Sequence, residues 1–168
     1  LLPGYDVADN DTDAMPNTSD MSHGTHVAGI ASGATNNGQG IASIGFNVKL
    51  IPVKSSNSAQ FVSDAYAGVV WAYQNDADVI NMSWGGSGFS QTGQNIITNA
   101  FNAGCVNVAA AGNDNVTTIF YPAGYDNIIS VASTTTNDAK SVFSNYGNWI
   151  DIAAPGSAIF STYIGNNF

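Results

Sequence analysis

The sequence predicts a three-layer α/β/α fold built on a mainly parallel sheet. Short apolar runs, typical of strands that are buried on both faces, alternate along the chain with longer helical patterns. Segments rich in glycine and asparagine follow several of these runs. Strands separated by helices form right-handed crossovers, which make the strands parallel and cover the sheet with helices.

Five apolar runs are predicted strands, and three segments are predicted helices. The strands are expected at residues 48–53, 79–82, 106–111, 128–132 and 149–153. The helices are expected from about residue 23 to 34, at 61–75 and at 93–103, with Gly104 just after the last one. No repeat or linker interrupts them, so we expect one continuous unit. Ligand sites in such sheets lie beyond the carboxyl ends of the strands.

The charge of the chain is strongly unbalanced. Its 12 acidic residues are all aspartate, only three lysines oppose them, and the net charge is −9. This balance argues against nucleic acid and anionic membrane surfaces as partners, and it favours cation binding. No apolar run approaches the length of a membrane span, so we expect a soluble protein. The single cysteine, Cys105, lies in an apolar run and is expected to be a buried structural thiol.

Two histidines three residues apart open the first predicted helix. Small residues follow them, including Gly24 and Gly29, which would let another backbone approach closely. Local chemistry leaves three interpretations open for His23 and His26: a zinc pair, two core histidines, or one catalytic base. Zinc has weak support, because the HExxH spacing and a carboxylate ligand are missing.

Two predicted strands end in segments suited to a binding site. Residues 79–82 run into Ser83, Trp84 and Gly85, and residues 106–111 run into Gly112 and Asn113. An asparagine at the end of a strand can aim its amide into a cleft, as stabilisation of an oxyanion requires. Taken alone, Asn113 is equally consistent with the start of a turn.

Together, these segments resemble the subtilisin-like (subtilase) serine peptidases. Residues 23–29, HGTHVAG, resemble the histidine signature of that family. Residues 79–86, VINMSWGG, resemble its substrate-binding strand, and residues 110–113, AAGN, resemble its oxyanion segment. The segments occur in the family's order over nearly the whole chain.

The resemblance implies a role for each matching residue. His23 corresponds to the general base and acid, and Asn113 to the side-chain donor to the oxyanion. His26 is expected to be structural. Residues of two segments would bind an extended polypeptide substrate by strand pairing and line its specificity pocket: Ser83, Trp84, Gly85, Ala110, Ala111 and Gly112.

Two members of the family's triad are not recognised in this chain. The family's aspartate stands in an Asp-Ser/Thr-Gly context before the histidine, and no aspartate before His23 has that context. The Gly-Thr-Ser-Met-Ala segment of the nucleophile is also absent, and neither Ser157 nor Ser161 replaces it. We therefore expect residues 1–168 to be a partial peptidase domain without the aspartate strand and the serine helix, with the remaining fragment of the same domain as a partner.

Two segments are candidate calcium loops. Four carboxylates lie within residues 6–13, and this loop resembles one found in thermitase-like subtilases: Asp6, Asp9, Asp11 and Asp13. A solvated acidic loop is the alternative. Residues 35–41 resemble the family's tight calcium loop, with a side-chain oxygen from Asn37 and carbonyl oxygens from Thr35, Gln39 and Ile41. A plain Asn-Gly turn is the alternative there.

The expected activity is that of a serine endopeptidase acting through an acyl-enzyme, with calcium as a structural ion. The alternative is an inactive relative that binds peptides or serves a structural role, or an inert fragment. The family implies an extracellular protein, although no signal peptide is visible in the sequence.

Overall fold

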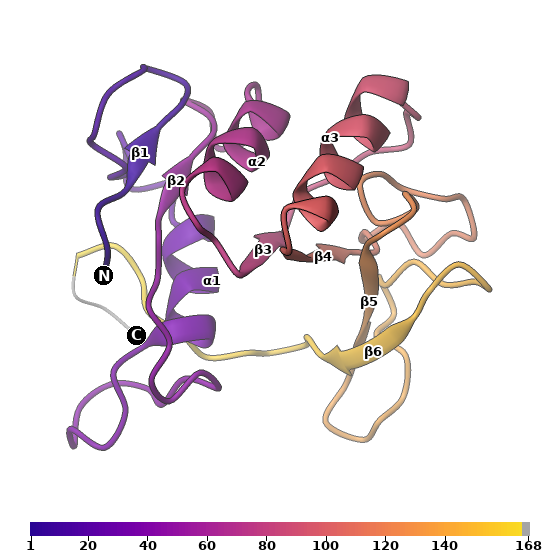
Figure 1. The fold of residues 1–168 in the computed structure, drawn as a ribbon. Helices are drawn as coiled ribbons and strands as arrows, with labels where there is room; N and C mark the ends of the chain where they lie inside the picture. The colour runs from indigo at the N-terminus through magenta and orange to yellow at the C-terminus, as the bar shows by residue number, and fades with distance from the viewer. Residues whose placement is uncertain (166–168) are drawn as a thin grey trace. The chain divides into compact units, whose positions relative to one another are not determined.

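The structure is a computed structural model that describes residues 1–165 in two compact units. The first unit contains residues 1–68 together with the described residues 160–165 near the end of the chain. The second unit contains residues 69–159. Figure 1 shows the elements of both units, and each unit is described by itself.

The first unit contains one helix and a two-stranded parallel sheet. The helix α1 spans His23–Ser32, and the strands β1 (Tyr5–Asp6) and β2 (Val53–Lys54) pair in register. The predicted strand at 48–53 is wrong over most of its length: Val48 is exposed, and only Val53 belongs to a strand. Pro52 has no N–H to donate to a ladder, which limits regular pairing before residue 53.

The second unit is built on a four-stranded parallel sheet in the order β3-β4-β5-β6. Its strands are β3 (Val79–Met82), β4 (Val106–Ala110), β5 (Ile129–Thr134) and β6 (Ile152–Pro155). The last strand begins later than predicted, because the preceding backbone is bonded to Ser130 instead. The Ser130 hydroxyl donates to Trp149 O at 2.8 Å and accepts from Asp151 N at 2.8 Å.

The helix α3 (Gln91–Asn102) lies against β4 (Figure 1). Its first turn is capped by Ser90, whose Oγ accepts a hydrogen bond from Gly93 N at 3.2 Å. Ala103 follows the helix, and Gly104 comes next with φ +100°, so the predicted glycine after the helix end is confirmed.

The helix α2 (Ala65–Gln74) begins four residues later than predicted. The backbone before it is already bonded to the segment after β2. Ser56 Oγ donates to Phe61 O at 2.7 Å, and Asp64 N donates to Ser55 O at 3.0 Å. A helix starting at residue 61 would have to break these contacts.

The two faces of the four-stranded sheet differ in burial. One face contributes buried residues to the core together with Ile97 and Ala100 of α3, namely Ile80, Met82, Ala109 and Ala132. The other face carries exposed apolar residues, one from each strand: Val79, Val106, Ile129 and Ile152. The predicted α/β class with a parallel sheet is confirmed. No helix within residues 1–165 is long and apolar enough to cross a membrane.

Candidate active site

His23 is the first residue of α1, and it is exposed. The residue before it, Ser22, is buried, and its carbonyl oxygen accepts the first helical hydrogen bond from His26 N at 3.0 Å. His26 is half-buried one turn further along the same helix. The helix therefore presents His23 at an accessible N-terminal position and His26 closer to the protein interior.

A segment near the end of the described chain bonds to two backbone carbonyl groups of α1. Ser161 Oγ donates to His26 O at 2.6 Å, and Thr162 Oγ1 donates to Thr25 O at 2.8 Å. A Cβ on Gly29 would lie 2.2 Å from Thr162 Oγ1 and 2.4 Å from Ser161 Oγ, so side chains approach Gly29 closely where another backbone was predicted. Gly24 faces open space, so the same prediction is wrong there. Ser161 is buried, and its hydroxyl is used in this packing.

Residues 83–85 follow β3 at the carboxyl edge of the sheet in the second unit. Ser83 Oγ accepts from Asn81 Nδ2 at 2.9 Å. A Cβ on Gly85 would lie 2.8 Å from Tyr121 O, so only glycine fits there without a shift of the backbone. Gly86 and Tyr121 exchange two backbone hydrogen bonds of 2.9 and 2.7 Å. This bridge fixes where the segment leaves the sheet.

The neighbouring strand β4 ends at Ala110, and residues 111–113 follow it. Ala111 is 1% exposed, so its methyl group belongs to the core, and of the three predicted wall residues Ala110 and Gly112 are the accessible ones. Gly112 has φ +105°, which turns the chain sharply before Asn113. Asn113 is exposed, and within residues 1–165 no hydrogen bond to its side chain is present.

A fully buried asparagine from a later loop contacts the backbone around Asn113. Asn145 Nδ2 donates to Ala111 O at 2.9 Å, and its Oδ1 accepts from Asp114 N at 2.9 Å and from Val116 N at 3.3 Å. Asn145 N also donates to Gly112 O at 3.0 Å. Asn145 was not predicted as a site residue, because no motif in the neighbouring sequence indicates its role.

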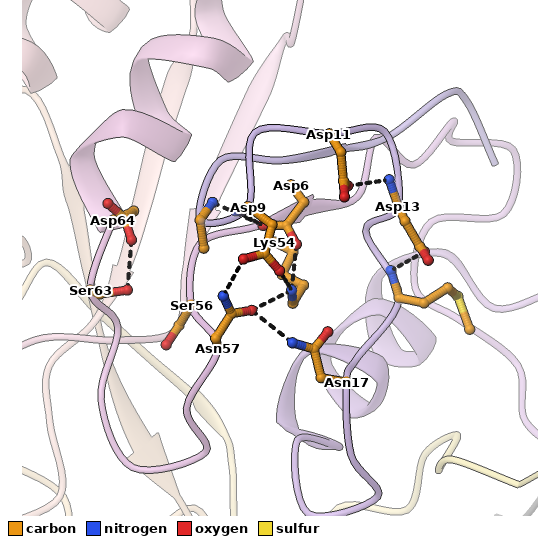
Figure 2. A network of polar contacts seen from close by, with 12 residues as sticks. Asp6, Asp9, Asp11, Asp13, Asn17, Lys54, Ser56, Asn57, Ser63 and Asp64 are labelled. Carbon is orange, nitrogen blue, oxygen red and sulfur yellow. Dashed lines mark hydrogen bonds and ion pairs between the residues drawn. The ribbon is translucent and has the colours of Figure 1, made fainter.

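The ammonium group of Lys54, in β2, contacts the acidic loop at residues 6–13 (Figure 2). Lys54 Nζ donates to Asp6 Oδ2, to Asp9 Oδ2 at 3.3 Å and to Asn57 Oδ1 at 2.6 Å. Asp6 is 1% exposed, and its other oxygen accepts from Ala8 N at 2.9 Å and from Asp9 N at 3.2 Å. A lysine ammonium therefore neutralises the buried end of the loop.

The pKa values of this network follow from these contacts. Burial, the largest single influence, lowers the pKa of Lys54, but the hydrogen bonds and charges of Asp6 and Asp9 outweigh it and raise that pKa above 10.5. The pKa of Asp9 is held below 3.8, first by the hydrogen bond from Asn57 and then by Lys54. These contacts therefore stabilise the ammonium form of Lys54 and the carboxylate form of Asp9.

The predicted calcium ligands differ in how well their arrangement suits an ion. Asp11 Oδ1 accepts from Asp13 N at 2.8 Å, and Asp13 Oδ1 accepts from Met15 N at 3.1 Å. These two carboxylates therefore face their own loop, while Asp6 and Asp9 face Lys54 (Figure 2). Within residues 1–165, no three histidine, cysteine or acidic side chains come together to hold a metal. The four carboxylates, arranged in this way, do not fit one calcium ion.

The second predicted calcium loop forms an open hollow lined by residues 36–42. Asn36, Gly38 and Gly40 have positive φ, so the backbone here turns repeatedly. Asn37 Oδ1, the predicted side-chain ligand, accepts from Gln39 N at 3.0 Å. The residues that line the hollow are all neutral, and backbone carbonyl groups are a donor type that suits calcium.

Comparison with protein families decides the class of this molecule. The model of the subtilase family matches residues 4–167. The chain belongs to the subtilase family. The histidine, substrate-strand and oxyanion segments that were recognised in the sequence all lie within the matched residues.

Several characterised proteins are similar to this subtilase. The "Thermophilic serine proteinase" of Bacillus sp. (strain AK1) is 42% identical over the whole chain, which covers 42% of that protein. "Thermitase" of Thermoactinomyces vulgaris is 44% identical over 97% of the chain and 58% of its own length. An "Extracellular protease" of Xanthomonas campestris pv. campestris is 43% identical over 88% of the chain and 28% of its own length.

A solved structure agrees with the sequence relatives. The protease of Pseudoalteromonas arctica PAMC 21717 has a TM-score of 0.84 and 38% identity, over 94% of this subtilase chain and 57% of that chain. The chain spans between 28% and 58% of the length of these relatives.

The predicted residues of this subtilase lie in both units. His23 and the two candidate calcium loops belong to the first unit, while Asn113 and the predicted substrate-binding residues belong to the second. Sequence reasoning missed Lys54 and Asn145, the two residues that hold loops of these units. One signal could have pointed to Lys54 as a partner of the acidic loop: it is one of only three basic residues in a chain with 12 aspartates.

Proposed function

We propose that the protein is a serine endopeptidase in which His23 is the general base and Asn113 the oxyanion donor. The observation that carries this proposal is the family match over residues 4–167, which includes both residues in their family segments. The exposure of both side chains supports it, since each is accessible to a substrate.

In the proposed reaction, a serine hydroxyl attacks the carbonyl carbon of the peptide bond and His23 accepts the hydroxyl proton. The carbonyl oxygen becomes an oxyanion, to which Asn113 Nδ2 donates a hydrogen bond. His23 then gives the proton to the leaving amine as the C–N bond breaks and the acyl-enzyme forms. Water, activated in turn by His23, hydrolyses the ester and regenerates the serine.

The substrate is proposed to be an extended polypeptide. It would pair by its backbone with residues 83–85, and a side chain would enter a pocket bordered by Ala110 and Gly112. The accessibility of residues 83–85 and of Ala110 supports this, because an extended backbone can reach them.

The serine and the aspartate of the triad are proposed to come from further parts of the same domain. Their family segments are not recognised in residues 1–168. The greater length of the matched relatives supports this proposal, as does the exposed apolar face of the sheet formed by Val79, Val106, Ile129 and Ile152.

Calcium is proposed to bind the hollow at residues 36–42 in preference to the acidic loop. Asn37 would supply its side-chain oxygen, and Thr35, Gln39 and Ile41 their carbonyl oxygens. The acidic loop is the weaker candidate, because Lys54 already faces Asp6 and Asp9. Secretion is also proposed, and the relative named as an extracellular protease supports it.

Labelling with a fluorophosphonate, followed by intact mass, tests the proposed activity in the full-length gene product. We expect one covalent adduct on a serine and hydrolysis of an unstructured peptide. His23→Ala should lower turnover by roughly six orders of magnitude, since loss of the general base disables the whole triad. Asn113→Ala should lower turnover roughly 10²–10³-fold.

His26→Ala is the matched control for the histidine variant, because it removes a second imidazole from the same helix. We expect turnover within about tenfold of the parent, with any loss explained by stability. A gene product that binds the peptide but forms no adduct would be an inactive binding relative. Equal activity of the His23 variant and the parent would also contradict the proposal.

A further inference from the structure

Two loops in the second unit are joined by backbone hydrogen bonds on both sides of Asn113. Asn145 N donates to Gly112 O at 3.0 Å, and Asn115 N donates to Phe143 O at 2.8 Å. Tyr146 N donates to Val116 O at 3.1 Å. Residues 112–116 are therefore held against residues 143–146, although neither segment is a strand.

The side chain of Asn145 adds three hydrogen bonds to this pairing. Its amide nitrogen donates to Ala111 O, while its oxygen accepts from Asp114 N and from Val116 N. The orientation of the amide is determined by its partners, because backbone N–H groups can only face the oxygen and a backbone carbonyl can only face the nitrogen. Asn145 thus connects the residue two before Asn113 to the residue directly after it.

The site around Asn145 is closed and closely fitted. Asn145 is 0% exposed. A Cβ on Gly112 would lie 2.5 Å from Asn145 Nδ2 and 2.8 Å from a ring carbon of Phe120, so the glycine is required for the buried amide to fit. From the surface, Lys140 Nζ joins the same two loops by donating to Asn115 Oδ1 at 2.7 Å and to Ser144 O at 3.2 Å.

The side chain of Asn113 is left available between these bonded backbone groups. Its neighbours on both sides have backbone groups bonded to Asn145, yet its own side chain is exposed and has no hydrogen bond within residues 1–165. A donor that stabilises an oxyanion works best when its position is fixed before the charge develops. The backbone around Asn113 is fixed by a group that cannot itself reach the substrate.

We propose that Asn145 is a positioning residue that holds the backbone from which Asn113 presents its amide to the oxyanion. The proposal rests on the proposed function of Asn113. Asn145 acts through Asn113: without it, residues 112–114 gain freedom, and the amide of Asn113 spends less time where the oxyanion forms. A displacement of about 1 Å in such a group can cost up to about 100-fold in rate.

A double-mutant cycle in the full-length gene product tests this role. Asn145→Ala, Asn113→Ala and the double variant are compared by kcat and KM on one peptide substrate. We expect Asn145→Ala alone to lower kcat about 10- to 100-fold, with KM within about twofold. In the Asn113→Ala background, the same change should lower kcat less than about threefold, because no amide remains to be positioned.

A peptide aldehyde gives a second readout, because its hemiacetal with the serine carries the oxygen that Asn113 is proposed to contact. Its inhibition constant should rise with Asn145→Ala by the same factor as kcat falls. Asn145→Ser keeps a neutral polar group in the buried site but loses the amide that bonds in both directions, so we expect an intermediate loss. This more conservative variant also serves if Asn145→Ala fails to fold.

Asn107→Ala is the matched control, because Asn107 is another buried asparagine of the second unit. Its Nδ2 donates to Ile97 O at 3.3 Å and to Asn127 O at 3.2 Å, away from residues 111–116. We expect a loss of stability with kcat within about threefold of the parent. Hydrogen exchange at the Asp114 and Val116 amides should become faster in the Asn145 variants and stay unchanged in the Asn107 variant.

An equal loss of kcat from Asn145→Ala in both backgrounds would overturn the proposal, since it would show a general structural effect. A loss no larger than that of Asn107→Ala would overturn it as well. Failure of the proposed function looks different: the parent would then form no fluorophosphonate adduct, or Asn113→Ala by itself would leave kcat unchanged.

Discussion

Two loops are each held by one buried polar side chain from elsewhere in the chain, which we call the anchor of the loop. They are the acidic loop of the first unit (residues 6–13) and the loop around Asn113 in the second unit (residues 112–116). In the first unit the anchor is charged: the ammonium group of Lys54 faces Asp6, which is 1% exposed. In the second unit it is a neutral amide, Asn145, which bonds only to backbone groups. A charged anchor leaves a buried opposite charge behind when it is removed, and its strength depends on pH. A neutral anchor leaves unsatisfied backbone groups, and its strength does not depend on its own titration.

Removal of the charged anchor is expected to have the largest effect on stability. Lys54→Met keeps most of the side-chain volume but leaves Asp6 buried without a cation. We expect a loss of about 3 kcal/mol in the free energy of unfolding, the low end of the range for broken buried ion pairs, because Asp9 stays partly solvated. Denaturant titration of the full-length protein at neutral pH measures it.

Lys140→Met is the matched control, since it removes an exposed ammonium that bonds to neutral oxygens. Its expected cost is below about 1 kcal/mol. If both lysine variants lost the same stability, the buried pair at Lys54 would not be the reason, and the comparison between the two anchors would fail.

Alkaline pH should weaken the charged anchor alone. The pKa of Lys54 is raised in the folded protein, so its contribution is fully present below the unfolded value of 10.5 and is lost as pH rises through the higher folded value. The stability difference between the parent and Lys54→Met should therefore be constant from about pH 5 to about pH 9 and shrink above 10.5. Unfolding followed across this range checks it.

The difference between the parent and Asn145→Ser is the reference for the neutral anchor. The parent side chain does not titrate, so no alkaline change of this difference is expected above pH 10.5. A difference that shrank in parallel with that of Lys54→Met would mean that the alkaline effect is global.

Calcium should have the smallest effect, and it should act away from the acidic loop. A few millimolar calcium is expected to raise Tm by a few degrees in both the parent and Lys54→Met, because the proposed site at residues 36–42 is independent of Lys54. Asn37→Ala should abolish the rise. A rise that disappeared in Asp11→Asn, with Asn37→Ala unaffected, would place the ion in the acidic loop instead.

Several features of the molecule could be predicted from local sequence. The strands β3 and β4, the helix α3 with Gly104 after it, and His23 at the start of α1 all agree with the expected positions. Cys105 is buried as predicted, and its thiol donates to Ala77 O at 2.8 Å. Burial, with a smaller contribution from Asp78, raises the pKa of this thiol. Each of these signals lies within a few residues of the feature it predicts.

Other features depended on partners that are distant in the sequence. The predicted strand at 48–53 failed because β1 pairs only with Val53 and Lys54. The helix at 61–75 began late because Ser55 and Ser56 had already bonded the backbone before it. Neither the short pairing of β1 nor the hydrogen bonds of Ser55 and Ser56 could be predicted from the local pattern of apolar residues.

By itself, the sequence determined the family, the α/β class and the positions of His23 and Asn113, because short motifs and apolar runs record local backbone preference and burial. Only the tertiary structure decided which buried polar group holds each loop. Lys54 meets Asp6 across 48 positions, and Asn145 meets Ala111 across 34. A buried ammonium or amide must find a partner, but which partner it finds depends on the loops that the folded chain brings together.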